Sequence, residues 1–174
     1  MEPARHRARL TLALGLHFWG GLDRKNGIVY DTDMIRQIVI DTNVFISALR
    51  SRRGASYRLF MLLDRGTFEI NISVPLIVEY EDVAKRIARE IGLASADIDD
   101  ILDYICSVAR KHIIHFLWRP FLKDPQDDHV LELAVEAGCD FIVTHNVRDF
   151  SGSERFGIRV VTPREFLRVI GGMP

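Results

Sequence analysis

The chain has 174 residues, 48% of them hydrophobic and 27% charged, an ordinary composition for a globular protein that buries one sizeable core. Its formal net charge of -1 gives no overall basic field, so a nucleic-acid partner must be held by a local patch or through a metal ion. Cys106 and Cys139 lie in apolar surroundings without metal-ligand spacing, which favours free thiols in a reducing cytoplasm over a disulfide or a zinc site.

Residues 1–33 are expected to lie outside the folded domain. The apolar run from Leu10 to Leu16 is too short to span a bilayer, and no small-residue cleavage pattern follows it. We therefore predict a poorly ordered extension or a start-site artefact over 1–33. We predict a single domain over residues 34–174, which begins at Met34, and no membrane partner.

Strand and helix signals alternate in the first half of that domain. Consecutive β-branched residues predict a strand over 37–40, and helical spacing follows from Val44 to about Arg65 with a polar break at 51–56. Alternating apolar residues then predict a strand over 67–73. Ser73 is expected to cap a helix over 74–90, with Pro75 in its first turn.

The second half continues the alternation. The predicted segments are a helix over 95–111 capped by Ser95, a short strand over 112–116, a helix from the cap Asp124 to Gly138, strands over 139–146 and 158–163, and a closing helix over 164–170. Strands that alternate with helices predict a parallel sheet covered on both faces. The expected fold class is therefore α/β, a three-layer α/β/α sandwich with a central, mainly parallel sheet.

Polar side chains follow two of the predicted strands. Asp41 comes directly after the strand over 37–40, and Asn146 and Asp149 follow the strand over 139–146. Ligands of such sheets bind outside the carboxyl ends of the strands, so parallel strands would bring these groups to one edge.

Two helices add further acids, which periodicity alone does not assign. Asp127 lies on the apolar face of its helix, where an acid is either a cap paired with Asp124 or a ligand. Asp128 lies just past the edge of that face. Glu79 and Glu81 flank the apolar face of the helix over 74–90 on opposite borders, so both remain candidates.

Three segments, at residues 38–49, 73–86 and 124–150, resemble the successive motifs of PIN-domain proteins. They are most similar to the group described as toxin components of toxin–antitoxin modules. The resemblance covers most of residues 35–168, and each motif is weak alone, whereas the ordered set is specific. It implies an endoribonuclease that uses Mg²⁺ or Mn²⁺, an antitoxin protein as partner and a homodimer.

Carried over residue by residue, the resemblance implies Asp41, Glu79 and Asp127 as the catalytic, metal-binding acids, preferring Glu79 to Glu81 and Asp127 to Asp128. Many members of the family carry an aspartate where this chain has Asn146, and Asp149 is the candidate that would replace the missing charge at a second metal position. The residues that would support the site are Thr42, Asn43, Ser47 and Thr144.

Electrostatics explains why such a cluster would bind a cation. Carboxylates about 5 Å apart repel by roughly 3 kcal/mol per pair at an effective dielectric constant near 20. Oxygen ligands suit Mg²⁺ or Mn²⁺ better than zinc, and a bound divalent ion activates water for attack on a phosphodiester. The chain has no motif for a nucleophilic side chain, a P-loop or an HExxH zinc site.

Arginines near the first helical break are candidates for binding RNA phosphates, with solvated surface as the other interpretation. The candidate RNA-binding residues are Arg50, Arg52, Arg53 and Arg148.

Two other function classes remain open. A catalytically weak relative would act only as a protein-binding partner, because Asn146 weakens the acid cluster. A phosphotransfer or phosphatase domain also places an aspartate after its first strand, but the haloacid pattern needs a second aspartate where this chain has Asn43.

Overall fold

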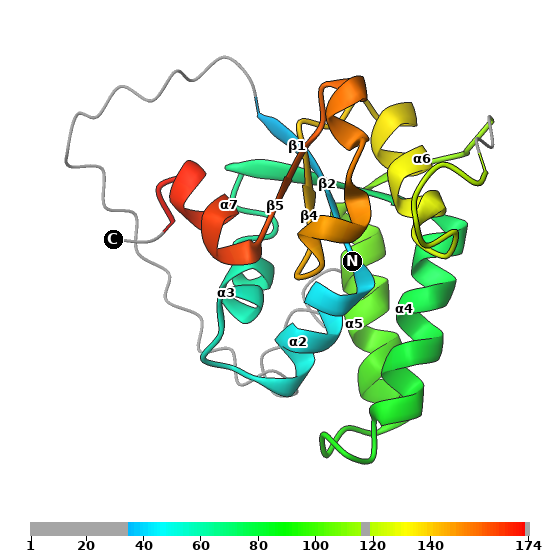
Figure 1. Ribbon diagram of the computed structural model, residues 1–174. Coiled ribbons are helices and arrows are strands. Elements are labelled where there is room, and N and C mark those ends of the chain that lie inside the picture. Colours follow the sequence, from blue (N-terminus) through cyan, green and yellow to red (C-terminus); the bar gives the residue numbers. More distant parts are fainter. Residues whose placement is uncertain (1–34, 116–118, 173–174) are drawn as a thin grey trace.

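The computed structural model describes residues 35–115 and 119–172, so the predicted extension over 1–33 and Met34 lie outside the described residues (Figure 1). The strands are β1 (Arg36–Ile40), β2 (Phe68–Ser73), β3 (Arg110–His112), β4 (Phe141–Val143) and β5 (Arg159–Val161). The α-helices are α2 (Thr42–Arg50), α3 (Ala55–Met61), α4 (Val74–Ile87), α5 (Ser95–Val108), α6 (Asp128–Glu136) and α7 (Pro163–Val169). Two short 3-10 helices, η1 (Val147–Phe150) and η2 (Ser153–Phe156), lie between β4 and β5.

The strands form one sheet in the order β3-β2-β1-β4-β5, and every pair of neighbours is parallel. Helices α3 and α7 lie on one side of the sheet and α6 on the other, with α4 and α5 beside it (Figure 1). The predicted three-layer α/β/α sandwich is therefore confirmed.

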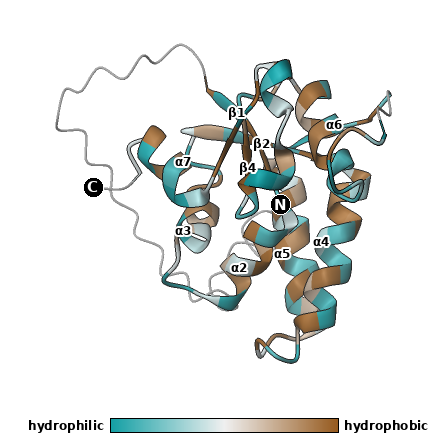
Figure 2. Cartoon of the chain, in the orientation of Figure 1, coloured by the Kyte–Doolittle hydropathy of each residue, from teal (hydrophilic) through white to brown (hydrophobic). Residues whose placement is uncertain are grey.

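The core lies between these layers, where hydrophobic residues run along the central strands (Figure 2). Ile38, Val39 and Ile40 of β1 are almost completely buried, as their β-branched run predicted. On one face, the ring of Phe166 in α7 meets the rings of Phe68 and Phe141 edge-on, each at 5.3 Å between centroids. Contacts of this kind attach one helix to both strands that flank β1.

Several predicted boundaries were wrong: α5 ends at Val108 and not at 111, and β4 covers only Phe141–Val143 of the predicted 139–146. The third strand covers Arg110–His112 and does not include residues 113–115, while residue 116 of the predicted strand lies outside the described residues. Helix α5 begins at Ser95, so its cap is Ala94, whose N–H donates to the carboxylate of Asp97 at 2.8 Å. Helix α6 begins only at Asp128, because residues 124–127 form a turn in which the Asp124 carboxylate accepts the N–H of Gln126.

Other local predictions hold. Helix α4 follows Ser73 and contains Pro75 in its first turn, although the Ser73 hydroxyl makes no capping hydrogen bond. Gly138 follows α6 with φ of +60°, a left-handed conformation that favours glycine. Cys106 and Cys139 are both free. Within residues 35–115 and 119–172, no helix has the length and apolar character needed to cross a membrane.

The direction in which strands are added to the sheet reverses at β1. The chain passes from β1 to β2 and β3 on one side, and then returns to β4 and β5 on the other. In open parallel sheets such a reversal leaves a crevice at the carboxyl ends of the two strands that flank it. Asp41 follows β1 and Thr144 follows β4, so both lie at this crevice.

Candidate active site

A pocket of about 540 Å³ opens at this crevice and continues between α2 and α4. The predicted acids Asp41, Glu79 and Asp127, which come from three separate segments of the chain, all line it. The pocket is also lined by the predicted residues Thr42, Asn43, Ser47, Arg50 and Asn146. The fold therefore brings the main candidates to one place.

Asp41 is the most enclosed of the three acids, with 6% of its surface exposed. Its carboxylate oxygen Oδ2 accepts hydrogen bonds from the Asn43 side-chain amide and the Thr144 hydroxyl, both at 2.6 Å. Burial raises the pKa of Asp41 despite the opposing Thr144 hydrogen bond, and the Glu79 charge raises it further. The Asp41 carboxylate is therefore held in place by neutral hydrogen-bond donors, whereas burial and the charge of Glu79 disfavour its ionised form.

Hydrogen bonds of Asn43 and Thr144 connect the segments that follow β1 and β4. The Asn43 side chain donates to the Thr144 hydroxyl oxygen at 3.0 Å and accepts the backbone N–H of His145 at 3.0 Å. The same hydroxyl oxygen accepts the backbone N–H of Asn146 at 2.9 Å. The expected supporting role of these residues thus corresponds to a network that fixes Asp41 relative to Asn146.

Glu79 is placed by its neighbour Tyr80. The Tyr80 hydroxyl donates to the carbonyl of Ile40, the last residue of β1, and its ring stacks on Phe45 of α2 at 4.6 Å. This contact holds the middle of α4 against the end of β1 and brings Glu79 to the pocket. Glu81 points elsewhere, because it pairs with Lys85 of the next turn at 2.6 Å.

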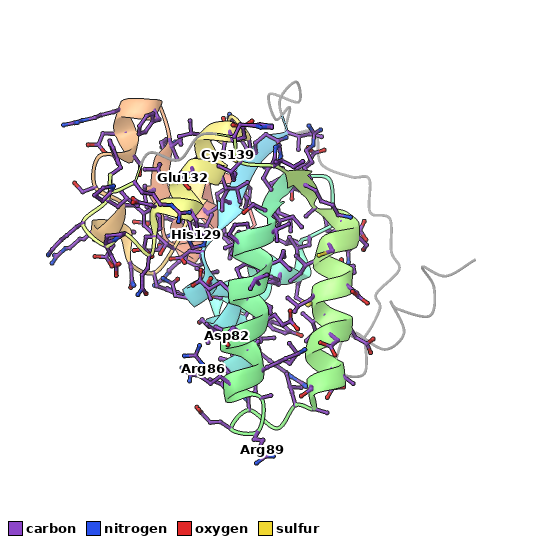
Figure 3. All side chains as sticks on the ribbon, turned by 90° about the vertical axis from the view of Figure 1, so that its right-hand side faces the viewer. Asp82, Arg86, Arg89, His129, Glu132 and Cys139 are labelled. Carbon is purple, nitrogen blue, oxygen red and sulfur yellow. The ribbon has the colours of Figure 1, made fainter. Side chains whose placement is uncertain are left out.

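Glu79 is paired with His129 of α6. His129 Nε2 lies 2.9 Å from a Glu79 carboxylate oxygen, and Nδ1 lies 2.7 Å from the Gln126 carbonyl, so Nδ1 carries the donated proton. Burial acts against both ionised forms, but the pairing outweighs it, lowering the pKa of Glu79 and raising that of His129. Figure 3 shows His129 on α6, close to the upper part of α4.

Asp127 has the most strongly shifted pKa of the three acids. Burial and neighbouring negative charges together raise it from 3.8 to about 6, with burial the largest cause and the charge of Asp41 the next. Asp149 and Glu79 act in the same direction. These contributions show that the carboxylates repel one another across the pocket. Asp127 occupies the N-cap position of α6, as one interpretation predicted, but its side chain makes no capping hydrogen bond and lines the pocket instead.

The fully buried acid at the start of α6 is Asp128, not Asp127. Asp128 is 1% exposed, and its carboxylate accepts the backbone N–H groups of Phe121 and Leu122, the latter at 2.8 Å. A helical wheel places Asp128 just past the apolar face, because it does not include the loop that covers this side chain. Asp128 is therefore a structural residue that holds the loop against α6.

Glu132 is a second buried acid that the sequence did not single out. Its carboxylate pairs with Arg119 at 3.1 Å and is only 3% exposed. The four-residue spacing from Asp128 to Glu132 was the available signal, since it places both acids on one side of α6.

The remaining predicted site residues lie around the pocket. Asp149, in η1, is half-buried and close enough to raise the pKa of Asp127. Arg52 and Arg53 are exposed beyond the end of α2, and Arg148 is exposed without lining the pocket. Arg50 is the only arginine among the described residues that line the pocket.

The donor set fits a hard divalent cation, although it does not enclose one. Carboxylate and amide oxygens of Asp41, Glu79, Asp127 and Asn146 face one open pocket, and their mutual repulsion would be relieved by a positive ion. No three acidic, histidine or cysteine side chains in the described part of the chain are arranged to hold one ion directly. Mg²⁺ usually keeps several waters and binds through only one or two carboxylates, so this open arrangement suits it.

A family model described as PIN domain matches residues 37–148, which include Asp41, Glu79 and Asp127. A search of curated proteins finds no match.

Proposed function

The chain belongs to the PIN domain family, whose members are generally nucleases that use divalent metal ions, and we propose that it is a Mg²⁺- or Mn²⁺-dependent endoribonuclease. The observation that carries the proposal is the meeting of Asp41, Glu79 and Asp127 in one pocket, with the pKa of Asp127 raised to about 6 by burial and by its neighbours. The reaction proposed is hydrolysis of an RNA phosphodiester by water.

Asp41, Glu79 and Asp127 are the residues that would hold the ion, with Asn146 and Asp149 as further oxygen donors. The ion would lower the pKa of a water molecule and offset negative charge on the phosphate. Asn43 and Thr144 hold the Asp41 carboxylate in one orientation, so it needs little rearrangement on binding. Asn146 contributes no charge, which favours fewer ions than a fully acidic site would take.

His129 sets the orientation of Glu79 before an ion arrives. Their pairing at 2.9 Å lowers the pKa of Glu79, whereas the neighbouring carboxylates raise the pKa of Asp127. A divalent ion competes with His129 for this carboxylate, so metal binding is expected to weaken the pair.

An RNA cleavage assay tests the proposal. Wild-type protein should cut single-stranded RNA only when Mg²⁺ or Mn²⁺ is present, and Asp41→Asn and Asp127→Asn should each lose the activity. The matched control is Asp82→Asn, because Asp82 is an exposed acid on α4 that pairs with Arg86 (Figure 3) and is not among the residues that line the pocket. Equal cutting by all four proteins would show that a contaminating nuclease is responsible.

The resemblance to toxin components supports a finer proposal. In this role the protein acts in the cytoplasm as the toxin of a toxin–antitoxin module, as a homodimer, with an antitoxin protein covering the pocket. Co-expression with the protein encoded beside it tests this: protection from growth arrest and a stable complex are expected, and neither should form with an unrelated protein.

A second function is favoured by one feature of the site, namely that no described trio of ligand side chains meets at one point. A catalytically weak protein would then serve as a binding partner for another protein. Binding of Mn²⁺ without any RNA cleavage, under conditions where a known nuclease of the family is active, would favour this alternative.

A further inference from the structure

The pocket has two chemically different ends. The acids and Asn146 occupy the end at the sheet, whereas Arg50 and Ser51 occupy the other. The wall between them contains the aliphatic side chains of Ile46 and Val83. An acidic end, an apolar middle and a basic end are more than a metal site alone requires.

The spacing along the two helices explains this arrangement. Asn43, Ile46 and Arg50 recur every three or four residues, so they share one face of α2. The rise from Asn43 to Arg50 is about 10 Å. Glu79 and Val83 are likewise one turn apart on α4, and α4 contacts α2. The two facing stripes therefore form one continuous groove that leads away from the acids.

Arg50 is held at the far end by a replaceable partner. Its guanidinium lies 3.3 Å from the carboxylate of Glu90, and the two side chains are 49% and 65% exposed. Such an exposed ion pair contributes little to stability, so a phosphate of a bound strand can displace Glu90 at small cost. A phosphate offers Arg50 a bidentate, charge-assisted hydrogen bond in exchange.

From these observations we propose that Ile46, Val83 and Arg50 form a binding site for the nucleotide next to the cleaved bond. This rests on the proposed ribonuclease function and adds to it the way the flanking RNA is held. The aliphatic pair contacts a base or ribose, and Arg50 leaves Glu90 to bind the adjacent phosphate.

The shape of the pocket also limits the kind of RNA. Its volume of about 540 Å³ lies in the range of pockets that enclose one small ligand, about 300–1,000 Å³. Asp41 is 6% exposed at its floor, so the reacting phosphate must enter the pocket. An unpaired strand can bend into it, whereas a base-paired strand remains on the outside of a stiff duplex.

Binding measurements test the site separately from catalysis. The protein carries Asp41→Asn, which prevents cleavage, and the probe is a fluorescent single-stranded oligoribonucleotide followed by anisotropy. Adding Arg50→Gln should raise Kd about tenfold, the loss expected for one charge-assisted hydrogen bond. Adding Glu90→Gln should lower Kd, because Arg50 is then released for the phosphate. Both side chains are exposed, and matching thermal unfolding curves will show that the fold is kept.

The matched control is Arg58→Gln, which removes the same charge from an exposed position on α3 outside the pocket. A change in Kd within about twofold is expected there, since only long-range charge is altered. Equal weakening by Arg50→Gln and Arg58→Gln would overturn the proposal, as would weaker binding in Glu90→Gln.

Cleavage kinetics in the otherwise wild-type protein separate the two proposals. Arg50→Gln should raise KM with little change in kcat, because it binds the RNA away from the reacting phosphate. Metal-dependent cleavage with an unchanged KM in Arg50→Gln would refute the nucleotide site and leave the ribonuclease proposal standing. Arg50-dependent RNA binding without any cleavage would do the reverse.

Discussion

Replacing Asp127 by asparagine should stabilise the metal-free protein, although the substitution is expected to abolish activity. The pKa of Asp127 is about 6 instead of 3.8, because burial and the neighbouring carboxylates, Asp41 above all, disfavour its ionised form. For an enclosed carboxylate this difference corresponds to about 3 kcal/mol. Asp127 is half-exposed, so solvent screening reduces the figure to about 1 kcal/mol. The expected rise in Tm is about 3 °C near neutral pH.

The pH dependence has a defined sign. Because the folded-state pKa of Asp127 is raised, the folded protein binds this proton more tightly than the unfolded chain between 3.8 and about 6. Stability contributed by Asp127 therefore falls as pH rises through this window, and the penalty is complete above it. The advantage of Asp127→Asn should be greatest above about pH 7 and should shrink as pH falls towards 3.8.

A divalent ion should reverse the order of the two proteins. Bound Mn²⁺ offsets the repulsion, so the wild type gains stability by mass action, about 2.7 kcal/mol at a metal concentration 100 times Kd. Asp127→Asn lacks one ligand and should gain less. Thermal unfolding followed by circular dichroism, with and without Mn²⁺, provides both comparisons. A lower Tm for the metal-free variant, or an equal metal-induced gain in both proteins, would refute the reasoning.

Three further substitutions examine the residues around the acids. Asp128→Asn should destabilise the protein by about 1–3 kcal/mol in urea unfolding, because this buried carboxylate accepts backbone N–H groups. Metal affinity should not change to match, and a large loss of Mn²⁺ affinity would contradict the structural role of Asp128. Thr144→Val removes a hydrogen bond to Asp41, so it should lower stability by about 1–2 kcal/mol and should also weaken Mn²⁺ binding. If calorimetry finds that the variant binds Mn²⁺ as tightly as the wild type, the supporting role of the network is refuted. The pairing of His129 with Glu79 raises the pKa of His129, so the stability that this pair contributes is complete below pH 6.5 and is lost as pH rises through the raised pKa. The stability deficit of His129→Gln should therefore disappear at high pH. A deficit independent of pH would refute the ionic part of the pairing.

Local patterns determined the elements and most of the candidate residues. The β-branched run of β1 and the alternation in β2 predicted both strands, because the period of side-chain burial is set by the backbone itself. Asp41 was identifiable as a strand-end acid for the same reason. Capping was less predictable: residues 124–127 have helix-start composition, yet they form a turn.

Contacts between distant segments decided what periodicity had left open. Tyr80 docks α4 on the end of β1, and that contact places Glu79 in the pocket while Glu81 pairs with Lys85. The strand order brings Thr144 to Asp41, which no local pattern specifies.

Burial of Asp128 and the end of the groove at Arg50 likewise depend on tertiary contacts. The loop that supplies the N–H groups of Phe121 and Leu122 covers Asp128, and Glu90 in the turn after α4 pairs with Arg50. A helical wheel describes one helix in isolation, whereas the surroundings of a side chain depend on which other segments pack against it.

The physical claim on which the functional interpretation depends is that carboxylates from distant parts of the chain line one pocket closely enough to repel one another and to favour a bound cation. Were titration by NMR to find Asp127 losing its proton near 3.8, like any carboxyl in water, that crowding would be absent and the interpretation would fail. Local sequence patterns therefore identified these residues as candidates, whereas the tertiary structure decides that they lie close together.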